Sequence, residues 1–168
     1  MAWRTGWHWR HAHWLWLSGV VFGVDQWSKM WVMDSLWRGQ RVNVVPGLLD
    51  LFYTVNPGAA FSFLANAGGW QRPFLTLIAL LVSVVLALWL MRLPQQSRWL
   101  PLSFSLILAG ALGNAADRIQ HGYVIDFILV YWQQWFFPTF NVADIAISCG
   151  AIMLLIDAFW PARSSQLQ

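Results

Sequence analysis

Four long apolar runs alternate with more polar segments along the chain, over about 14–33, 73–91, 100–117 and 142–160. Each run approaches the ~20 residues that a helix needs to cross the hydrocarbon of a bilayer. No long linker or internal repeat divides the sequence, so we expect residues 1–168 to form a single membrane-embedded domain. The pattern predicts an all-α membrane protein with four transmembrane helices.

The segment between the first two runs, about 34–72, is less hydrophobic. Turn residues punctuate it at Gly39, Pro46-Gly47, Asn56-Pro57-Gly58 and Gly68-Gly69. Short β-rich pieces lie between these turns, which predicts a small β-sheet or cradle outside the membrane. We expect the segment 117–139, between the third and fourth runs, to be a loop on the same side of the membrane.

The basic residues give an orientation for the four predicted helices. Four crossings place both termini and the loop that holds Arg92 and Arg98 on one side. Arg4 and Arg10 precede the first run on that side, which favours a cytoplasmic location by the positive-inside rule. Arginines on the other side, such as Arg38 and Arg72, weaken the bias. The segment 34–72 is therefore expected to be extracytoplasmic.

Composition supports the membrane assignment and excludes other classes. Charged residues make up only 10% of the chain, whereas soluble domains carry about a quarter. The 14 tryptophans suit a chain with long membrane–water boundaries. The net charge of +3 comes without a basic stripe, so no nucleic-acid partner is expected. The single cysteine, Cys149, cannot form an internal disulfide, and we expect it to be a small packing residue.

The N-terminus raises two alternatives. Residues 1–13 hold His8, His11 and His13, but no cysteine or acid joins them, so a polar terminus is favoured over a metal site. The first apolar run might be a cleavable signal peptide. It continues directly into Asp25-Gln26-Trp27-Ser28-Lys29 without a small-residue cleavage site, which favours a retained helix.

Asp25 and Lys29 are four residues apart in the first predicted helix. This spacing places them on one helical face, with the acid N-terminal to the base as pairing prefers. The pair can be a structural ion pair near the membrane surface or a polar support beside a site. The two interpretations are compatible.

Two aspartates lie where apolar runs meet polar segments. Asp126 is embedded in the apolar stretch 123–130, and Asp144 begins the fourth run just after Asn141. Asn141 or Asp144 could simply cap a helix N-terminus. Two carboxylates in one desolvated site would instead share a proton. Such a dyad supplies a base that activates water and an acid that polarises a carbonyl, as in aspartic proteases.

Other chemistries fit the sequence less well. Ser148, Cys149 and His121 have no partner in sequence reach that would make a nucleophile system. A two-carboxylate metal site is possible, but hydrolytic metals usually recruit histidine or more acids, so neither metal nor cofactor is predicted. A non-enzymatic bundle could conduct protons or ions through Asp25, Lys29, Asp126 and Asp144. That reading needs polar groups through the full depth of the bilayer, and here they cluster on one side.

Three further polar residues invite interpretation. Arg118 could pair with Asp117 or with a lipid phosphate, or act as an ordinary interfacial anchor. Asn114 could hydrogen-bond the backbone of a neighbouring segment and hold its shape. The turn at Asn56-Pro57-Gly58, followed by Ala59-Ala60, would let the backbone approach a ligand closely, or could be a plain reversal.

Five short stretches together carry a family resemblance. They are Asp25-Gln26-Trp27-Ser28-Lys29, Asn56-Pro57-Gly58-Ala59-Ala60-Phe61, Gly113-Asn114-Ala115-Ala116-Asp117-Arg118, Val124-Ile125-Asp126-Phe127 and Phe140-Asn141-Val142-Ala143-Asp144. In this order, between four apolar runs, they resemble the bacterial lipoprotein signal peptidases, or signal peptidase II, over about 14–161.

The resemblance implies a four-helix aspartyl endopeptidase of the inner membrane, with a small extracytoplasmic sheet and a short membrane-surface helix. Its substrates would be diacylglyceryl-modified prolipoproteins, cut before the lipidated cysteine at the boundary with membrane phospholipid. Carried over by position, Asp126 and Asp144 match the catalytic pair. The residues that match those lining or bracing the site are Asp25, Lys29, Asn56, Gly58, Asn114, Asp117, Arg118, Asn141 and Ala143.

Overall fold

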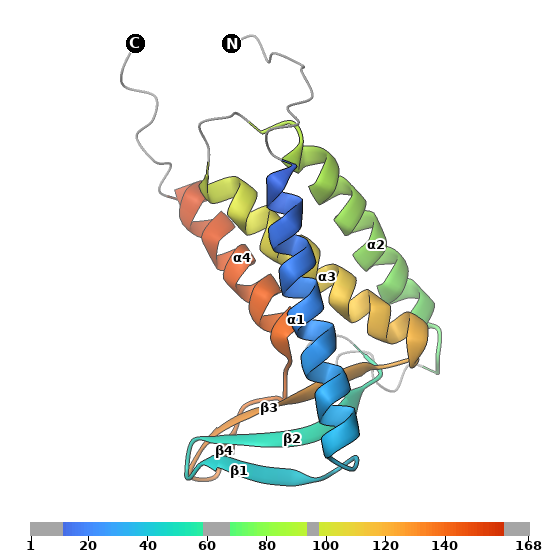
Figure 1. Ribbon diagram of the computed structural model, residues 1–168, viewed down its shortest axis with the longest axis vertical. Helices are drawn as coiled ribbons and strands as arrows, with labels where there is room; N and C mark the ends of the chain where they lie inside the picture. Colours follow the sequence, from blue (N-terminus) through green and yellow to red (C-terminus); the bar gives the residue numbers. More distant parts are fainter. Residues whose placement is uncertain (1–11, 59–67, 94–97, 160–168) are drawn as a thin grey trace.

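The structure, a computed structural model, describes residues 12–58, 68–93 and 98–159. Its helices are α1 (His13–Ser35), α2 (Gln71–Leu90), α3 (Trp99–Gln120) and α4 (Val142–Phe159). Its strands are β1 (Arg41–Val45), β2 (Leu49–Asn56), β3 (Val124–Trp132) and β4 (Trp135–Phe136). The helices form a bundle, and the sheet lies across one end of it (Figure 1).

The four helices confirm the four predicted helical segments. By length and composition α2, α3 and α4 could each cross a membrane, whereas α1 is long enough but more polar. The short membrane-surface helix that the resemblance implies falls in none of the described segments. His8, His11 and Ala59-Ala60 also lie outside them.

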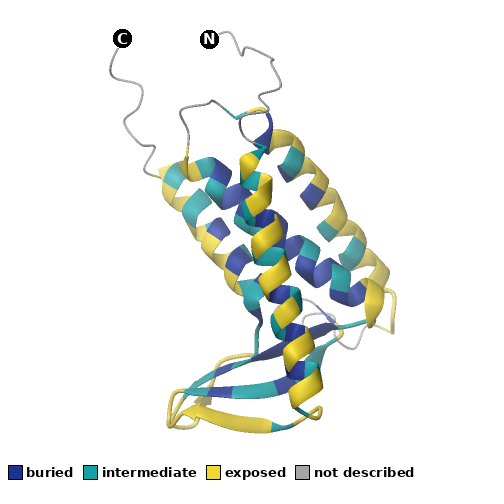
Figure 2. Ribbon diagram, viewed as in Figure 1, coloured by how far each residue is buried: buried dark blue, intermediate teal, exposed yellow. Residues whose placement is uncertain are grey.

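Helix α3 is the centre of the bundle because it packs against α1, α2 and α4 (Figure 2). Its small residues allow a close approach of α4. A Cβ atom on Gly110 would lie 2.3 Å from the Ala143 carbonyl oxygen. In the middle of α4, a Cβ on Gly150 would lie 2.7 Å from the carbonyl oxygen of Ser103. These contacts hold the α3 and α4 backbones together.

The sheet contains four antiparallel strands in the order β1-β2-β3-β4. The prediction of β-structure between 34 and 72 is confirmed by β1 and β2, but the prediction of a loop over 117–139 is wrong. Residues 124–132 form β3, which pairs along β2 with Thr54 opposite Asp126. An unbroken apolar run suits a strand buried on both faces, and the first four residues of β3 are all buried.

A small apolar core attaches the sheet to the bundle. Val32 of α1 packs with Tyr53, Ile125 and Phe127 from the two central strands, and all four are buried. This core fixes the root of β3 against α1, so the side chains of β3 have defined positions relative to the helices.

The close approach of α3 and α4 predicts opposite effects for one type of substitution. Gly150→Ala would push a methyl group into the Ser103 carbonyl, and we expect it to destabilise the protein by roughly 1–3 kcal/mol. Gly19→Ala is the matched control, because a Cβ on Gly19 has no neighbour within 4 Å. There, alanine should be neutral or stabilising in a helix. Thermal unfolding in detergent measures the stability of both variants. Equal shifts of the unfolding midpoint in Gly150→Ala and Gly19→Ala would contradict the close contact at Gly150.

Candidate active site

The structure brings Asp126 and Asp144 to one cavity. Asp126 lies on β3, and Asp144 lies in the first turn of α4. Both line a cavity of about 630 Å³ between the helices and the sheet. Asp126 is only 2% exposed, and Asp144 is half-buried. Two carboxyl groups from segments 18 residues apart therefore face a common, largely apolar space.

Two asparagines connect the aspartates. Asn141 donates a hydrogen bond from Nδ2 to Asp126 Oδ1 at 2.8 Å. Asn114 of α3 donates from Nδ2 to Asp144 Oδ1, also at 2.8 Å. The two amides are themselves joined, because Asn141 Nδ2 lies 3.3 Å from Asn114 Oδ1. This arrangement holds both carboxyl groups in fixed positions with N–H donors.

The start of α4 uses Asn141 and Asp144 as reciprocal caps. The Asp144 amide donates to Asn141 Oδ1 at 2.9 Å, and the Asn141 amide donates to Asp144 Oδ2 at 3.3 Å. This is the geometry of a capping box, with Asp144 three residues after the cap. The alternative weighed from the sequence, a helix cap, is therefore present together with the shared cavity. One pair of residues serves both.

Burial raises the pKa of Asp126 to about 7, and the nearby charge of Asp144 adds to the effect. Hydrogen bonds from Asn141 and Asn56 act in the opposite direction but do not cancel the cost of desolvation. Asp126 is therefore poised to hold a proton near neutral pH, which an ordinary aspartate cannot do.

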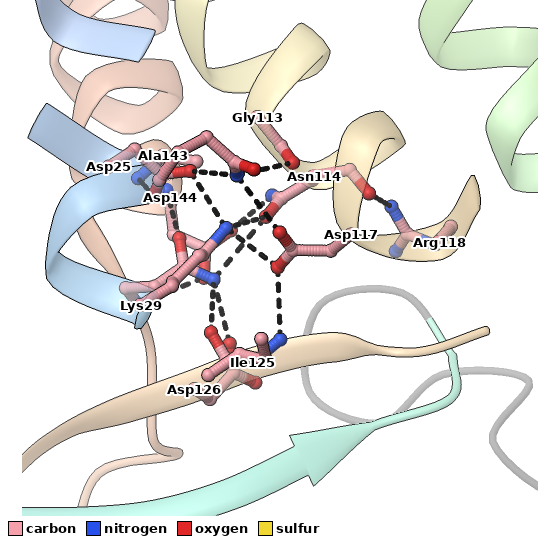
Figure 3. Close-up of polar contacts among 12 residues, drawn as sticks. Asp25, Lys29, Gly113, Asn114, Asp117, Arg118, Ile125, Asp126, Ala143 and Asp144 are labelled. Atoms are coloured by element: carbon pink, nitrogen blue, oxygen red, sulfur yellow. Dashed lines mark hydrogen bonds and ion pairs between the residues drawn. The ribbon is translucent and has the colours of Figure 1, made fainter. Parts of the chain in front are cut away.

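A buried ion cluster lies beside the two aspartates (Figure 3). Lys29 Nζ lies 2.8 Å from Asp25 Oδ2 and 2.8 Å from Asp117 Oδ2, and all three side chains are 1% exposed. The predicted Asp25–Lys29 pair is confirmed, with Asp117 as a second acid. Lys29 also donates to Asn114 Oδ1 at 3.3 Å. That contact leaves the Asn114 amide nitrogen facing Asp144.

The predicted pairing of Arg118 with Asp117 is wrong. Neighbouring residues on a helix point in different directions, and these two have different partners. Asp117 faces Lys29 and accepts the Ile125 amide of β3 at 3.0 Å. Arg118 donates instead to the Gly58 carbonyl at 2.7 Å and to the Asn114 carbonyl at 3.2 Å.

The remaining predicted support residues also contact the network. The Ala143 amide donates to Asp25 Oδ1 at 2.8 Å, which ties the start of α4 to α1. Asn56 Oδ1 accepts the Gly58 amide at 3.0 Å, which closes the turn whose Gly58 carbonyl Arg118 reaches. Each of these contacts is made at least in part by the backbone, so the contact could not be predicted from the residue type.

Gln26 and Gly113 also contact the ion cluster, although no role was predicted for either residue from the sequence. Gln26 Nε2 donates to Asp117 Oδ1 at 2.9 Å. A Cβ on Gly113 would lie 2.5 Å from Asp25 Oδ2, so only glycine leaves room for that carboxylate. Gln26 directly follows Asp25 in the sequence, and Gly113 directly precedes Asn114. This adjacency to predicted site residues was the only indication of a role.

The prediction of Cys149 as a packing residue is wrong, because it is exposed on α4. Ser148 and Cys149 both line the cavity, more than a helical turn from Asp144. Apolar side chains from three helices line the same space, among them Leu75, Ile78, Val82, Ile107 and Ile147. The cavity thus combines a small polar end, where the aspartates lie, with a larger apolar part along the helices.

Comparisons with known proteins agree on one family. The profile of the family described as Signal peptidase (SPase) II matches residues 17–160. Lipoprotein signal peptidases of Pseudomonas aeruginosa (strain UCBPP-PA14) and Pseudomonas fluorescens (strain Pf0-1) are 47% and 52% identical to the chain over 154 residues. The aligned part covers 91% of this chain and 91% of each relative.

Solved structures with the same fold are also known. A bacterial membrane enzyme determined by the in meso method at 2.3 Å resolution superposes with a TM-score of 0.80 and 26% identity. The match covers 94% of this chain and 95% of that one. Together with the profile and the identities, the superposition shows that the chain belongs to the signal peptidase II family.

Proposed function

We propose that Asp126 and Asp144 form an aspartate dyad that removes the signal peptide of prolipoproteins by activating water. The expected cut lies just before the diacylglyceryl-modified cysteine, as in the family that the sequence resembles. The observation that carries the proposal is the shared cavity, in which a buried carboxyl group with a pKa of about 7 faces a second carboxyl group.

The hydrogen bonds support different roles for the two acids. Both oxygens of Asp144 accept N–H groups, from Asn114 and from the Asn141 backbone, which favours the carboxylate form. Asp126 holds the proton near neutral pH. Asp144 is then the base that takes a proton from water, and Asp126 is the acid that donates to the oxygen of the scissile carbonyl.

The bonds change in a fixed order in this mechanism. The water oxygen adds to the carbonyl carbon while its proton passes to Asp144 and Asp126 protonates the carbonyl oxygen. The tetrahedral intermediate collapses when the C–N bond breaks and the leaving amine takes the proton from Asp144. The carbonyl oxygen returns its proton to Asp126. Both residues end as they began, so the cycle needs no cofactor.

The buried cations stabilise this arrangement of acids. Asp25, Asp117 and the singly protonated dyad would carry three negative charges, and Lys29 and Arg118 balance two of them. Arg118 also has a buried Nε without a hydrogen-bond partner among the described residues. Arg118 lines the cavity, so its positive charge lies beside the space in which the substrate peptide would bind.

The apolar part of the cavity fits the lipid of the substrate. Residues of α2, α3 and α4 form its walls, and these are the helices apolar enough to cross a membrane. Acyl chains could therefore remain in an apolar environment while the peptide bond reaches the aspartates. A single site of this kind serves a substrate that is half lipid and half peptide.

The same contacts support a membrane topology. We infer that α1 is the fourth spanning helix, since its Asp25 and Lys29 are paired inside the protein rather than exposed to lipid. Arg92 and Arg98 flank the connection between α2 and α3, at the end of the bundle away from the sheet (Figure 1). By the positive-inside rule, they support a sheet on the extracytoplasmic side of the inner membrane.

Replacing either aspartate should abolish cleavage. We expect Asp126→Asn and Asp144→Asn to lower the rate on a diacylglyceryl-modified precursor by at least roughly 10²–10⁴-fold, because each removes one partner of a proton transfer. Mass analysis of the released signal peptide measures the rate. The matched control is Asp34→Asn, an exposed aspartate near the end of α1. Wild-type turnover by either dyad variant would sink the assignment.

The rate should also depend on the proton that Asp126 holds. Above a pH of about 7, Asp126 loses this proton and the pair becomes doubly ionised. We therefore expect kcat/KM to fall about tenfold per pH unit on the alkaline side, with an apparent pKa that belongs to the pair. A profile that stays flat from pH 6 to 9 would rule out a required proton on Asp126.

The same raised pKa predicts a stability difference. In the unfolded chain Asp126 ionises near 3.8, and in the folded protein it ionises near 7, so folding favours the protonated form. The contribution of Asp126 is thus fully present below pH 4 and is lost as the pH rises through 7. Asp126→Asn does not titrate, so at pH 8 the variant should be more stable than wild type by roughly 2–4 kcal/mol. Unfolding midpoints of the variant and of wild type at pH 4 and pH 8 test this. A difference between the two proteins that is the same at both pH values would contradict it.

A further inference from the structure

The end of the sheet where β3 turns into β4 projects away from the helices (Figure 1). It carries two exposed tryptophans. Trp132 is the last residue of β3 and is 66% exposed, and Trp135 begins β4 and is 82% exposed. The two pair across the hairpin. Exposing two indole rings to water is unfavourable, and large exposed apolar patches mark surfaces that meet a membrane or a partner.

The strand geometry shows which face these rings occupy. Side chains alternate between the faces of a strand, so Asp126, Ile128, Val130 and Trp132 of β3 share one face. Trp135 joins this face because it is the cross-strand partner of Trp132. Asp126 on this face reaches Asn141 at the start of α4. The tryptophan pair therefore lies on the face of the sheet that is turned toward the start of α4, whereas Ile125 and Phe127 on the opposite face pack against α1.

The opposite face of the sheet is polar at the same place. Arg41 pairs with the buried Asp50, and Asn43 donates to Asp50 at 2.6 Å. The Arg41 guanidinium lies 4.7 Å from the centre of the Tyr131 ring and 5.2 Å from that of Phe136. Burial alone would raise the pKa of Asp50, but the hydrogen bonds from Arg41 and Asn43 outweigh it and lower that pKa. The end of the sheet is thus amphipathic, with charge on one face and tryptophan on the other.

The tryptophan pair is also continuous with the membrane-facing surface of the bundle. Phe137, 53% exposed, and Phe140 follow β4 and meet edge to face at 5.8 Å between ring centres. Both line the cavity that holds Asp126 and Asp144. Ile145 comes next on α4 and is 42% exposed, on a helix apolar enough to span a membrane. A strip of aromatic and apolar side chains therefore runs from Trp135 to the outside of α4.

We propose that Trp132 and Trp135 anchor the end of the sheet in the headgroup region of the inner membrane, in its extracytoplasmic leaflet. An indole ring combines an apolar body with one N–H donor, which suits the boundary between acyl chains and headgroups. No acidic side chain lies on this face of β3 beyond Asp126, so nothing there opposes contact with phospholipid. The occupant of this surface is the bilayer itself.

The anchor would set the height of the catalytic aspartate. Asp126 and Trp132 are six residues apart on one continuous strand, a separation of about 20 Å at ~3.3 Å per residue. The bundle supports one end of β3 through the core around Val32, and the bilayer would support the other. Tilting of the sheet would then be restricted at both ends, which keeps Asp126 level with the boundary where a lipid-linked peptide leaves the membrane.

Quenching by lipid tests the contact directly, without any catalytic turnover. Single cysteines at positions 132, 135 and 136, in a chain carrying Cys149→Ser, are labelled with an environment-sensitive fluorophore. The proteins are reconstituted in phosphatidylethanolamine–phosphatidylglycerol nanodiscs that contain a phospholipid with a nitroxide high on its acyl chain. We expect at least twofold quenching for Trp132→Cys and Trp135→Cys. Phe136→Cys is the matched control, because it lies in the same hairpin on the opposite face and should be quenched little.

The outcomes separate the proposal from its competitors. No quenching at 132 and 135, or equal quenching at all three positions, would overturn it. A spectral change at 135 only when precursor is added would assign the surface to substrate instead, and would also overturn it. As a second measurement, Trp132→Ser/Trp135→Ser should raise KM for the precursor several-fold in bilayers and leave it unchanged in micelles. An equal change in both media would contradict an anchor while leaving the proposed peptidase activity intact.

Discussion

The structure depends on one buried cation. Lys29 lies in a site with almost no access to water, and an unpaired ammonium group there would cost several kcal/mol. It can remain only if Asp25 and Asp117 stay beside it, so α1 and α3 are fixed relative to each other. Asp25 then holds the start of α4 through the Ala143 amide, and Asp117 holds β3 through the Ile125 amide. The next residue in each of these segments is a proposed catalytic aspartate.

The asparagines link this ion cluster to the dyad. Asn114 accepts from Lys29 and donates to Asp144, so the direction of its amide is set by the charge behind it. Asn141 caps α4 and also donates to Asp126, which makes the start of a helix part of the site. Supports of this kind are expected where two acids must be held within a fraction of an ångström. The same groups stabilise the fold and position the proposed catalytic pair.

Much of this could be read from the sequence, and the failures have physical causes. The helices were predictable because each buries its backbone polar groups by itself and needs only a long apolar run. The β3 strand was missed because residues 123–130 show no polar alternation that would separate a strand from a buried loop. The Asp117–Arg118 pair failed because the partners of both residues, Lys29 and Gly58, are far away in the chain. Asp126 and Asp144 reach one cavity because of the register of β3 and the position of the first turn of α4. Neither can be derived from the spacing of residues in the sequence.

The contacts of Gly110 and Gly150 have a consequence for how a substrate can enter. Both glycines bring the backbones of α3 and α4 close together, because a Cβ atom at either position would overlap a carbonyl oxygen of the other helix. These two helices behave as one wall, and separating them would expose peptide groups and leave a void. The cavity also has a second wall, formed by Leu75, Ile78, Ala79 and Val82 of α2. Widening the cavity for the acyl chains of the proposed substrate would therefore require movement of the α2 side, while the α3–α4 side stays fixed.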